Sequence, residues 1–411
     1  MMDEIDVAII GAGAAGIAAA RRLAWSPLSS IVLEASPRRG GRARTERHAA
    51  FPLDLGCEWL HSADRNPLAR LAEAAGVALD RRPAPWHGQY ADLGFSASEQ
   101  AAASEAFANW SQKLRANPPA SDCAADALAP EGAWNAFIRA NVSYISGMAP
   151  ERISAADYAT YEIASTGENW RAPSGYGALI AGAAPPGADI RLSTPVRSIG
   201  LGAPGVTLAT PRGDLRARAV IITVSTAVLA SGALVMPAEL EPWRVAASLL
   251  PLGRNEKVFL EIVGRSPFAP ETHVFGDPRD AAMGSYLIQP HGLNFIECFL
   301  GGVGAALLAE EGPQAGFVRA ADQLAGLFGA DVRKRLLPLA ATGWSAERYI
   351  GGAYSCAMPR HAAARQALAR PFDNRIFFAG EAAHERDFTT AHGAYATGVR
   401  AAEDVLSALA V

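Results

Sequence analysis

The chain of 411 residues has few cysteines, no long apolar run and no large excess of one charge. Its four cysteines lie far apart and form no CxxC pair, which disfavours a disulfide framework and a cysteine-ligated zinc site. The formal net charge is −4 and no basic block stands out, so nucleic acid is not expected as the main partner. No metal site is predicted.

The chain also lacks the features of a signal peptide and of a membrane span. Acidic residues stand near the N-terminus where a signal peptide carries basic ones. The longest apolar stretch, residues 219–236, is interrupted by threonine, serine and glycine. Its β-branched start is typical of a buried strand followed by a turn. We therefore expect a cytoplasmic protein without a membrane partner, as a monomer or a homodimer.

The composition is that of a globular protein, with 50% hydrophobic and 19% charged residues. At roughly 150 residues per domain, the length predicts two or three domains with a large core. The 39 glycines and 27 prolines predict many turns, but the sequence contains no internal repeats and no low-complexity linkers.

The first 34 residues have the pattern of a dinucleotide-binding βαβ unit. An apolar run, Val7–Ile10, is followed by GAGAAG, a helix-forming segment, a second apolar run and then Glu34. Gly11 permits the tight turn, Gly13 lets backbone N–H groups approach a pyrophosphate, and Gly16 lets the helix pack closely on the strand. Glu34 can accept hydrogen bonds from ribose hydroxyls. An acid at this position argues against a 2′-phosphate, so the motif predicts FAD or NAD rather than NADP.

A second glycine turn follows in residues 37–45, which read PRRGGRART. Its N–H groups and the Arg42 guanidinium can bind phosphate oxygens, although a solvated basic turn is the ordinary alternative. At this spacing after Glu34, the pattern resembles the GGR signature of the FAD-dependent amine oxidase family.

The resemblance extends in family order from residue 7 to residue 406 and is weakest over about 80–165 and 265–335. Residues 59–67, WLHSADRNP, are most similar to the polyamine oxidase-like branch. The further segments that carry the resemblance are 54–61, 174–179, 194–199, 219–229, 252–259, 344–355 and 376–406.

The resemblance implies an α/β fold of the glutathione-reductase-like, Rossmann class with two domains. A discontinuous FAD-binding domain is expected from residues 1–75, 175–245 and 340–411. A mixed α+β substrate-binding domain is expected from residues 76–174 and 246–339. Alanine-rich stretches at 100–108 and 316–326 predict amphipathic helices within it.

The resemblance also implies which residues bind FAD, without a covalent link because Ala353 occupies the position of the linking cysteine. Val196 is expected on the strand beside the adenine, and the N-terminus of a helix at Ala391 is expected to point at the flavin, where its dipole stabilises negative charge. The expected cofactor-binding residues are Gly11, Gly13, Ala15, Gly16, Glu34, Gly41, Arg42, Gly56, Val196, Gly380, Glu381 and Ala391.

Three residues are expected to take part in catalysis. Lys257 stands in NEKVFLEI, a strand of alternating character where a lysine is ordinarily exposed. By resemblance it holds a water near the flavin and assists proton movement or the reaction with oxygen. His61 is expected to position the substrate, with acid–base work possible because imidazole titrates near neutral pH. Tyr354 matches one wall of the aromatic cage that surrounds the substrate nitrogen.

Three further residues are expected to contact the substrate. Thr390 occupies the position of the second cage aromatic and argues against a cage like that of monoamine oxidases. Trp59 and Trp344 are expected near the flavin, although both fit ordinary buried aromatics. No role is assigned to a set of acids that could attract a polycation: Glu58, Glu162, Glu168, Glu385 and Asp387.

Together these features predict an FAD-dependent amine oxidase. Its expected reaction is hydride transfer from an amine, best matched by a polyamine, to flavin N5, with O2 reduced to hydrogen peroxide. The alternatives within the fold are an L-amino-acid oxidase and a carotenoid or porphyrinogen-type desaturase or oxidase. A flavin-binding module without turnover is the alternative from another class.

Overall fold

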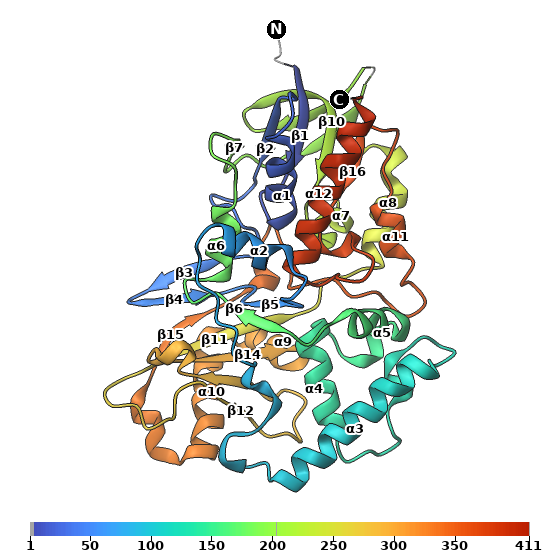
Figure 1. Cartoon of the computed structure of the whole chain (residues 1–411). Coiled ribbons are helices and arrows are strands. Elements are labelled where there is room, and N and C mark those ends of the chain that lie inside the picture. Colours follow the sequence, from blue (N-terminus) through green and yellow to red (C-terminus); the bar gives the residue numbers. More distant parts are fainter. Residues whose placement is uncertain (1–3, 203, 411) are drawn as a thin grey trace.

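The structure, a computed structural model, describes residues 4–202 and 204–410 and has two main parts, each built on its own sheet (Figure 1). The helices are α1 Ala14–Leu23, α2 Pro67–Ala74, α3 Ala97–Ala116, α4 Asn135–Ser146, α5 Ala155–Ala164, α6 Tyr176–Gly182, α7 Thr226–Ser231, α8 Glu241–Ser248, α9 Gly302–Glu311, α10 Pro313–Phe328, α11 Ala364–Ala369 and α12 Ala391–Ala408. The strands are β1 Glu4–Ile10, β2 Ser30–Leu33, β3 Thr45–His48, β4 Phe51–Asp54, β5 Trp59–His61, β6 Asn169–Arg171, β7 Asp189–Arg191, β8 Ser198–Leu201, β9 Val206–Thr210, β10 Gly213–Ile222, β11 Asn255–Ile262, β12 Thr272–Phe275, β13 Ser285–Ile288, β14 Phe295–Gly301, β15 Leu336–Ala341 and β16 Ile376–Phe378.

The first sheet has the order β7-β2-β1-β10-β9-β8, with β16 paired to β10, and lies in the upper half of Figure 1. Strands β7, β2, β1, β10 and β16 run parallel, and Ile10 lies in register with Leu33 and Ile222. The carboxyl ends of these strands therefore meet at one edge, where ligands bind in doubly wound folds. Helices α1 and α12 pack side by side on one face of this sheet, and α7, α8 and α11 lie on the other.

The second sheet is antiparallel, has the order β12-β13-β14-β11-β15, and packs against α9 and α10. In strand β11 the residues Asn255 to Leu260 are all buried, so the ordinary alternative of an exposed strand lysine at position 257 does not hold. Val258 and Leu260 pack into the core beneath α10, whereas Phe259 packs against Phe51 and Trp344. The strand is thus buried on both faces, so Lys257 is a buried lysine.

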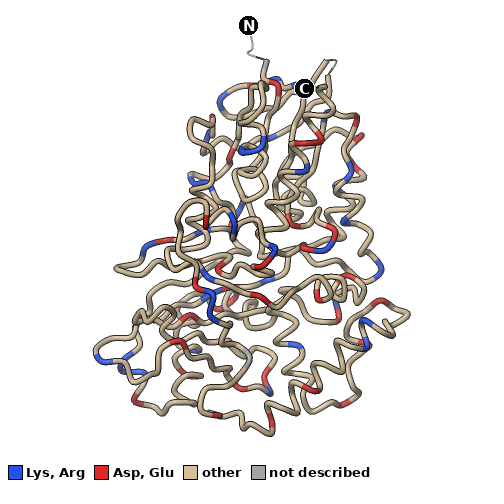
Figure 2. The backbone as a smooth tube through the Cα atoms, viewed as in Figure 1, with Lys and Arg blue, Asp and Glu red and all other residues tan. Residues whose placement is uncertain are grey.

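Two small sheets lie between the main parts. Strands β3 and β4 form one, and β5 pairs with β6 in the other, so residues 59–61 of the expected FAD-binding segment join residues 169–171 of the expected substrate segment. The exact ranges of the two domains stay a prediction. Figure 2 shows acidic and basic residues interspersed along the backbone of both parts.

Most expected elements are confirmed. Residues 100–108 and 316–326 lie within the helices α3 and α10, and the strand expected at the start of 219–236 is the end of β10. The expectation that only a turn follows this strand is wrong, because the short helix α7 begins at Thr226. The expectation that Val196 lies within a strand is wrong, since β8 begins at Ser198. Among the described residues, no helix is both long enough and apolar enough to cross a membrane.

Candidate active site

A cavity of about 1450 Å³ lies between the two parts and is lined from both. It runs along the carboxyl edge of the parallel strands and continues past β5 and β11 toward α3 and α5. Every residue expected at the site lines it except Gly16. Residues spread from position 11 to position 391 are thus brought to one space, although the individual roles assigned to them stay predictions.

The two glycine turns are joined to one another at one end of this cavity. The Gly11 N–H donates to Leu33 O at 2.8 Å, and the Gly40 N–H donates to Ala12 O at 2.8 Å. Gly11 has a φ of +104°, which a residue with a side chain rarely adopts. A Cβ on Gly16 would lie 1.9 Å from Gly11 O. Gly16 therefore permits the close packing of α1 on the turn and does not itself face the cavity.

Other glycines face open space, as a cofactor cradle requires. A Cβ built on Gly13 would have its nearest protein atoms at 3.9 Å, in the Gly40–Gly41 turn. A Cβ on Gly380, whose φ is +142°, would meet no described protein atom within 4 Å. Both residues line the cavity. The turns thus leave room for a pyrophosphate beside the N-terminus of α1, so the residues present fit a dinucleotide.

The Glu34 carboxylate is held rigidly at the end of β2. It accepts hydrogen bonds from the Ala12 N–H at 2.6 Å, from the Ser36 N–H at 2.8 Å and from the Ser36 hydroxyl at 2.7 Å. A carboxylate has about four acceptor sites, so one remains for a ribose hydroxyl. That contact stays a prediction.

Arg42 and Glu381 pair with each other inside the cavity. Arg42 Nη1 lies 3.0 Å from Glu381 Oε1 and also donates to Ala353 O at 2.5 Å. Glu381 accepts three further hydrogen bonds, from the Ser355 N–H and hydroxyl and from the Thr389 N–H. Burial acts to raise the pKa of Glu381, but Arg42 and Arg365 outweigh it and hold this pKa below its ordinary value. Glu381 is therefore an ionised anchor between the GGR turn and the C-terminal block.

Helix α12 begins at the cavity wall with a capped N-terminus. The Thr390 hydroxyl oxygen accepts from the Gly393 N–H at 2.9 Å and donates to Asp387 O at 2.6 Å. The first N–H groups of a helix have no intrahelical partner, and Ala391, the first residue of α12, lines the cavity. The geometry therefore suits an anionic group at this point. Thr390 serves as the helix cap as well as a wall residue.

Lys257 lies at the centre of a buried ionic cluster. Its Nζ lies 2.9 Å from Asp54 O, 3.0 Å from Glu58 Oε2 and 2.8 Å from Glu297 Oε1. Burial acts to lower the pKa of Lys257, but the two carboxylates outweigh it and raise the pKa above its ordinary value. The lysine thus stays protonated.

The two acids of this cluster also hydrogen-bond each other. Burial and the adjacent Glu58 charge raise the pKa of Glu297 well above its ordinary value. Burial would also raise the pKa of Glu58, but the Lys257 ammonium and Glu297 lower it. Two such close groups titrate as a unit, and the pair holds a proton at a pH where isolated carboxyls do not.

His61 has one defined tautomer. Its Nδ1 lies 2.6 Å from Asn169 Oδ1, and the Asn169 amide nitrogen donates to Gly167 O, which fixes the orientation of the amide. Nδ1 therefore carries the hydrogen, and Nε2 is left as an acceptor. Burial lowers the pKa of His61 and so favours the neutral ring, although the hydrogen bond that the ring donates to Asn169 acts in the opposite direction.

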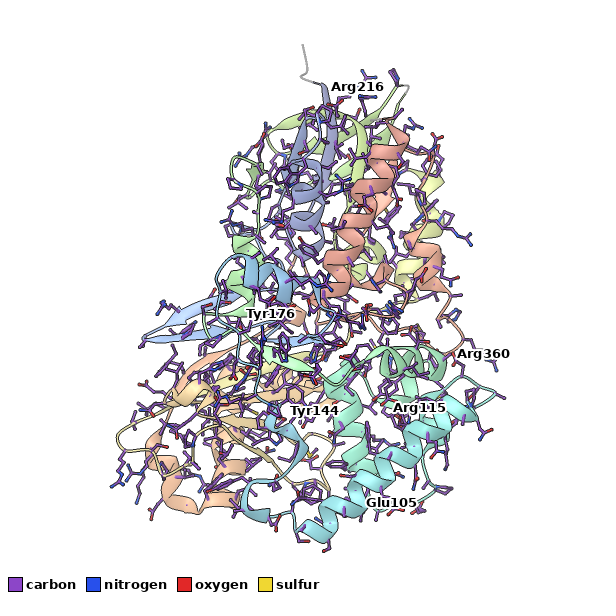
Figure 3. All side chains as sticks on the ribbon, viewed as in Figure 1. Glu105, Arg115, Tyr144, Tyr176, Arg216 and Arg360 are labelled. Carbon is purple, nitrogen blue, oxygen red and sulfur yellow. The ribbon has the colours of Figure 1, made fainter. Side chains whose placement is uncertain are left out.

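Aromatic rings form the walls on the substrate-domain side of the cavity. Trp59 meets Trp86 edge-to-face with ring centroids 4.3 Å apart, and Tyr144 lies 5.8 Å from Phe299. The Tyr354 hydroxyl donates to Tyr144 O, so its ring faces the cavity as an apolar wall. Figure 3 labels Tyr144 on α4 and Arg115 near the end of α3, both in the lower part of the molecule.

Trp344 and Gly56 define the floor beside β4. The Trp344 indole donates to Leu55 O at 2.9 Å, and a Cβ on Gly56 would lie 1.7 Å from Arg42 O. Gly56 is therefore required for the close approach of these segments. Trp344 combines a buried structural role with a place in the cavity lining.

Several lining residues carried no signal in the sequence. Glu297, Trp86 and Tyr144 stand in segments where the resemblance is weak, and Asn169 lies between such a segment and the next matching one, with no motif around it. Glu58 stood in a recognised segment but had no assigned role. Its neighbour Glu297 is brought close only by the fold.

One group of potential metal ligands lies outside this cavity and comprises Asp80, Glu271 and His291. Arg171 contacts Asp80 at 2.9 Å and Glu271 at 2.7 Å, and Arg82 contacts both acids as well. These arginines already neutralise the carboxylates, so we assign no metal there.

The fold and the cavity define a two-domain, dinucleotide-binding oxidoreductase of the Rossmann class. Comparison with known proteins identifies the family, because the family model described as flavin containing amine oxidoreductase matches residues 14–116 and 94–406. The chain belongs to the flavin-containing amine oxidoreductase family. It is a flavin-dependent amine oxidase with FAD as its cofactor, as the sequence predicted.

Several curated relatives span nearly the whole chain, and two of them show the range. Polyamine oxidase 2 of Arabidopsis thaliana is 28% identical and aligns with 97% of this chain and 87% of its own. Lysine-specific histone demethylase 1B of Mus musculus is 24% identical over 97% of this chain but only 52% of its own length. A solved structure of wild-type putrescine oxidase bound to putrescine has a TM-score of 0.78 at 18% identity, covering 98% of this chain and 99% of that one. This likeness supports the fold.

Proposed function

We propose that this enzyme oxidises a polyamine, with FAD held non-covalently and O2 as the electron acceptor. The observation that carries the proposal is the continuation of the cavity beyond the cofactor turns, along Trp59 and Tyr354, to Glu162 and Arg115. Its volume of about 1450 Å³ exceeds the roughly 300–1,000 Å³ of a typical single-ligand site. The extra space fits a long, flexible substrate beside the cofactor. The polyamine oxidases among the relatives support the same class.

The residues near β5 suit the binding of an amine nitrogen. The free acceptor on His61 Nε2 can take a hydrogen bond from an N–H of the substrate. The rings of Trp59 and Tyr354 provide apolar walls that exclude water and hold the alkyl chain. Thr390 presents a small side chain where a second ring would narrow the space.

When bound, FAD accepts the hydride that leaves the α-carbon of the amine, and the resulting imine is hydrolysed. The N-terminus of α12 at Ala391 would stabilise negative charge on the cofactor once it is bound. Ala353 provides no nucleophilic side chain, and its carbonyl accepts from Arg42, which fits non-covalent binding. The proposed products are an aldehyde, a shortened amine and hydrogen peroxide.

A substrate panel tests the proposal. Spermine, spermidine, an N-acetylated polyamine and benzylamine are mixed with the holoenzyme without oxygen, and the rate of loss of flavin absorbance is measured. The polyamines should bleach the flavin faster than benzylamine, and admission of air should restore the colour with stoichiometric peroxide. Faster reduction by benzylamine would overturn the substrate class, and recovery without peroxide would overturn O2 as the acceptor.

A further inference from the structure

The ammonium group of Lys257 has no proton left for an additional partner. Three acceptors, Asp54 O, Glu58 Oε2 and Glu297 Oε1, lie within 3.0 Å of its Nζ. An ammonium has three protons, so these contacts use all of them. A water bound to this lysine would have to displace one of the protein acceptors. The groups in the cluster with spare capacity are the carboxyls of Glu58 and Glu297, and both line the cavity.

The cluster contains one more acid than base. The side chains of Lys257, Glu58 and Glu297 are 6%, 11% and 9% exposed. With both acids ionised the buried cluster carries a net charge of −1, whereas one added proton makes it neutral. A cationic substrate placed beside the ionised cluster therefore balances its charge.

The surrounding charged and titratable groups do not remove this imbalance. Asp54 accepts hydrogen bonds from the N–H groups of Tyr176 and Gly177, and Arg171 is paired with Asp80 and Glu271. Burial raises the pKa of Asp54 to about 6. The remaining titratable neighbours of the cluster are Cys57, His61, His291 and Cys298. Burial lowers the pKa of both histidines, so neither supplies a fixed positive charge.

The reaction requires a group that removes a proton from the substrate. An alkylammonium has a pKa close to the roughly 10.4 of lysine, so a polyamine enters largely protonated at neutral pH. Hydride loss from the α-carbon needs the nitrogen lone pair, which protonation blocks. We propose that Glu58 and Glu297 form the catalytic base that accepts this proton, with Lys257 as the positioning residue that holds the pair. This assignment rests on the proposed amine oxidation.

The proton transfer is balanced in charge and electrons. The N–H bond of the substrate ammonium breaks, its electron pair stays on nitrogen, and the proton binds a carboxylate oxygen of the pair. The cluster changes from −1 to 0 while the substrate nitrogen changes from +1 to 0. No oxidant is consumed in this step. The raised pKa of Glu297 makes the pair a stronger base than an isolated glutamate, and general bases work best near the ambient pH.

The pH dependence of flavin reduction tests the assignment. We compare Glu297→Gln and Glu58→Gln with the wild type by anaerobic stopped flow at low amine concentration. Near pH 7 each variant should reduce its flavin roughly 10²-fold more slowly, the usual loss for a general base. Near pH 10 the amine is partly neutral in solution, so the variants should approach the wild-type rate. A loss of the same size at both pH values would overturn the proposal.

Glu256→Gln is the matched control. Glu256 precedes Lys257 on β11 and is equally buried, but it accepts hydrogen bonds from the Trp344 N–H and the Thr342 hydroxyl and does not belong to the described lining of the cavity. If this substitution slows flavin reduction, it should do so by the same factor at pH 7 and at pH 10. If Glu256→Gln slowed flavin reduction at neutral pH only, the pH-dependent loss of rate would not be specific to Glu58 and Glu297. That result would overturn the assignment of the pair as the base.

A second readout needs no turnover. Infrared spectra of the holoenzyme labelled with ¹³C-glutamate should show one protonated carboxyl band that persists to higher pH than the others. The band should disappear in Glu297→Gln and remain in Glu256→Gln. Its persistence in Glu297→Gln would overturn the proposal. If no amine reduces the wild-type flavin, the proposed function fails, while this band still reports on the pair.

Discussion

Arg42 and Glu381, separated by 339 positions in the chain, form an ion pair inside the cavity with 3.0 Å between Nη1 and Oε1. Glu381 is almost completely buried, and Arg42 is also bonded to Ala353 O. The pair ties together the GGR turn, the segment before Tyr354 and the loop after β16. It therefore couples the shape of the cofactor site to the stability of the fold.

Arg42→Met should destabilise the protein and weaken FAD binding, because it leaves a buried carboxylate without its nearest cation. The expected loss in the free energy of unfolding is about 1–3 kcal/mol by urea titration at neutral pH, since Arg42 is partly exposed. Adding Glu381→Gln should recover part of it. Because the pKa of Glu381 is lowered on folding, its contribution is present above the unfolded pKa of about 4.3 and is lost as the pH falls below it. A pH-independent difference between wild type and Glu381→Gln would contradict this account.

Gly13→Ala should impair FAD binding, whereas Gly16→Ala should impair the stability of the fold. A Cβ on Gly13 has its nearest protein atoms at 3.9 Å, so the apoprotein should fold normally but lose FAD, whose pyrophosphate needs that space. A Cβ on Gly16 would lie 1.9 Å from Gly11 O, so that variant should lose stability before any cofactor is added. Thermal unfolding of the apoproteins and the flavin content of the purified proteins separate the two effects.

Gly182→Ala is the control for this pair, because its Cβ would meet no described atom within 4 Å. It should bind FAD and unfold like the wild type. Stoichiometric FAD in Gly13→Ala would remove Gly13 from the cofactor site.

Lys257→Met should retain FAD but slow flavin reduction or reoxidation at least about tenfold, a change of about 1.4 kcal/mol in the barrier. The substitution also leaves Glu58 and Glu297 side by side without a cation. Their pKa values in the folded variant should rise above the unfolded value of about 4.3, so its stability should decrease as the pH rises through that value. Urea titrations across this range measure the slope, and single-turnover kinetics measure both half-reactions. If Lys257→Met reduced and reoxidised its flavin at the wild-type rates, Lys257 would have only a structural role.

Thr390→Tyr should shift the preference from spermine toward benzylamine, because a ring at this position rebuilds the second wall. The substitution also removes the cap of α12, and losing a threonine cap costs about 1 kcal/mol. Thr390→Val loses the cap without adding a ring and serves as the control. The measurement is the ratio of kcat/KM for the two amines, which should change in Thr390→Tyr only. An equal change in both variants would attribute the effect to the cap.

Asn169→Asp should raise the pKa of His61, because a carboxylate beside Nδ1 stabilises the imidazolium. The protonated ring would lose the acceptor on Nε2, so binding of the amine should weaken at neutral pH and recover as the pH rises. His61→Ala should weaken binding at every pH, and more for spermine than for a short amine. NMR titration of His61 and the KM values across pH test this. An unchanged His61 pKa in Asn169→Asp would refute the assigned tautomer.

The sequence alone was sufficient for the fold class and for most of the residues that line the cavity beside the glycine turns. Gly11, Gly13 and Glu34 could be recognised because a phosphate-binding turn demands particular residues at fixed spacings on one short segment. The same holds for the helix that begins at Ala391, whose cap and apolar periodicity are local. Local backbone requirements restrict which residue types can stand at fixed positions, and this restriction can be recognised without knowledge of the tertiary structure.

Only the tertiary structure decided how the charged residues are used. Glu58, Lys257 and Glu297 lie on three different segments, and nothing in their spacing indicates that they meet in one buried cluster. Likewise, β11 is buried on both faces because two cores pack against it, which its own sequence did not indicate. Burial and ionic pairing depend on the groups that distant segments bring close, and these neighbours determine which residue holds the proton.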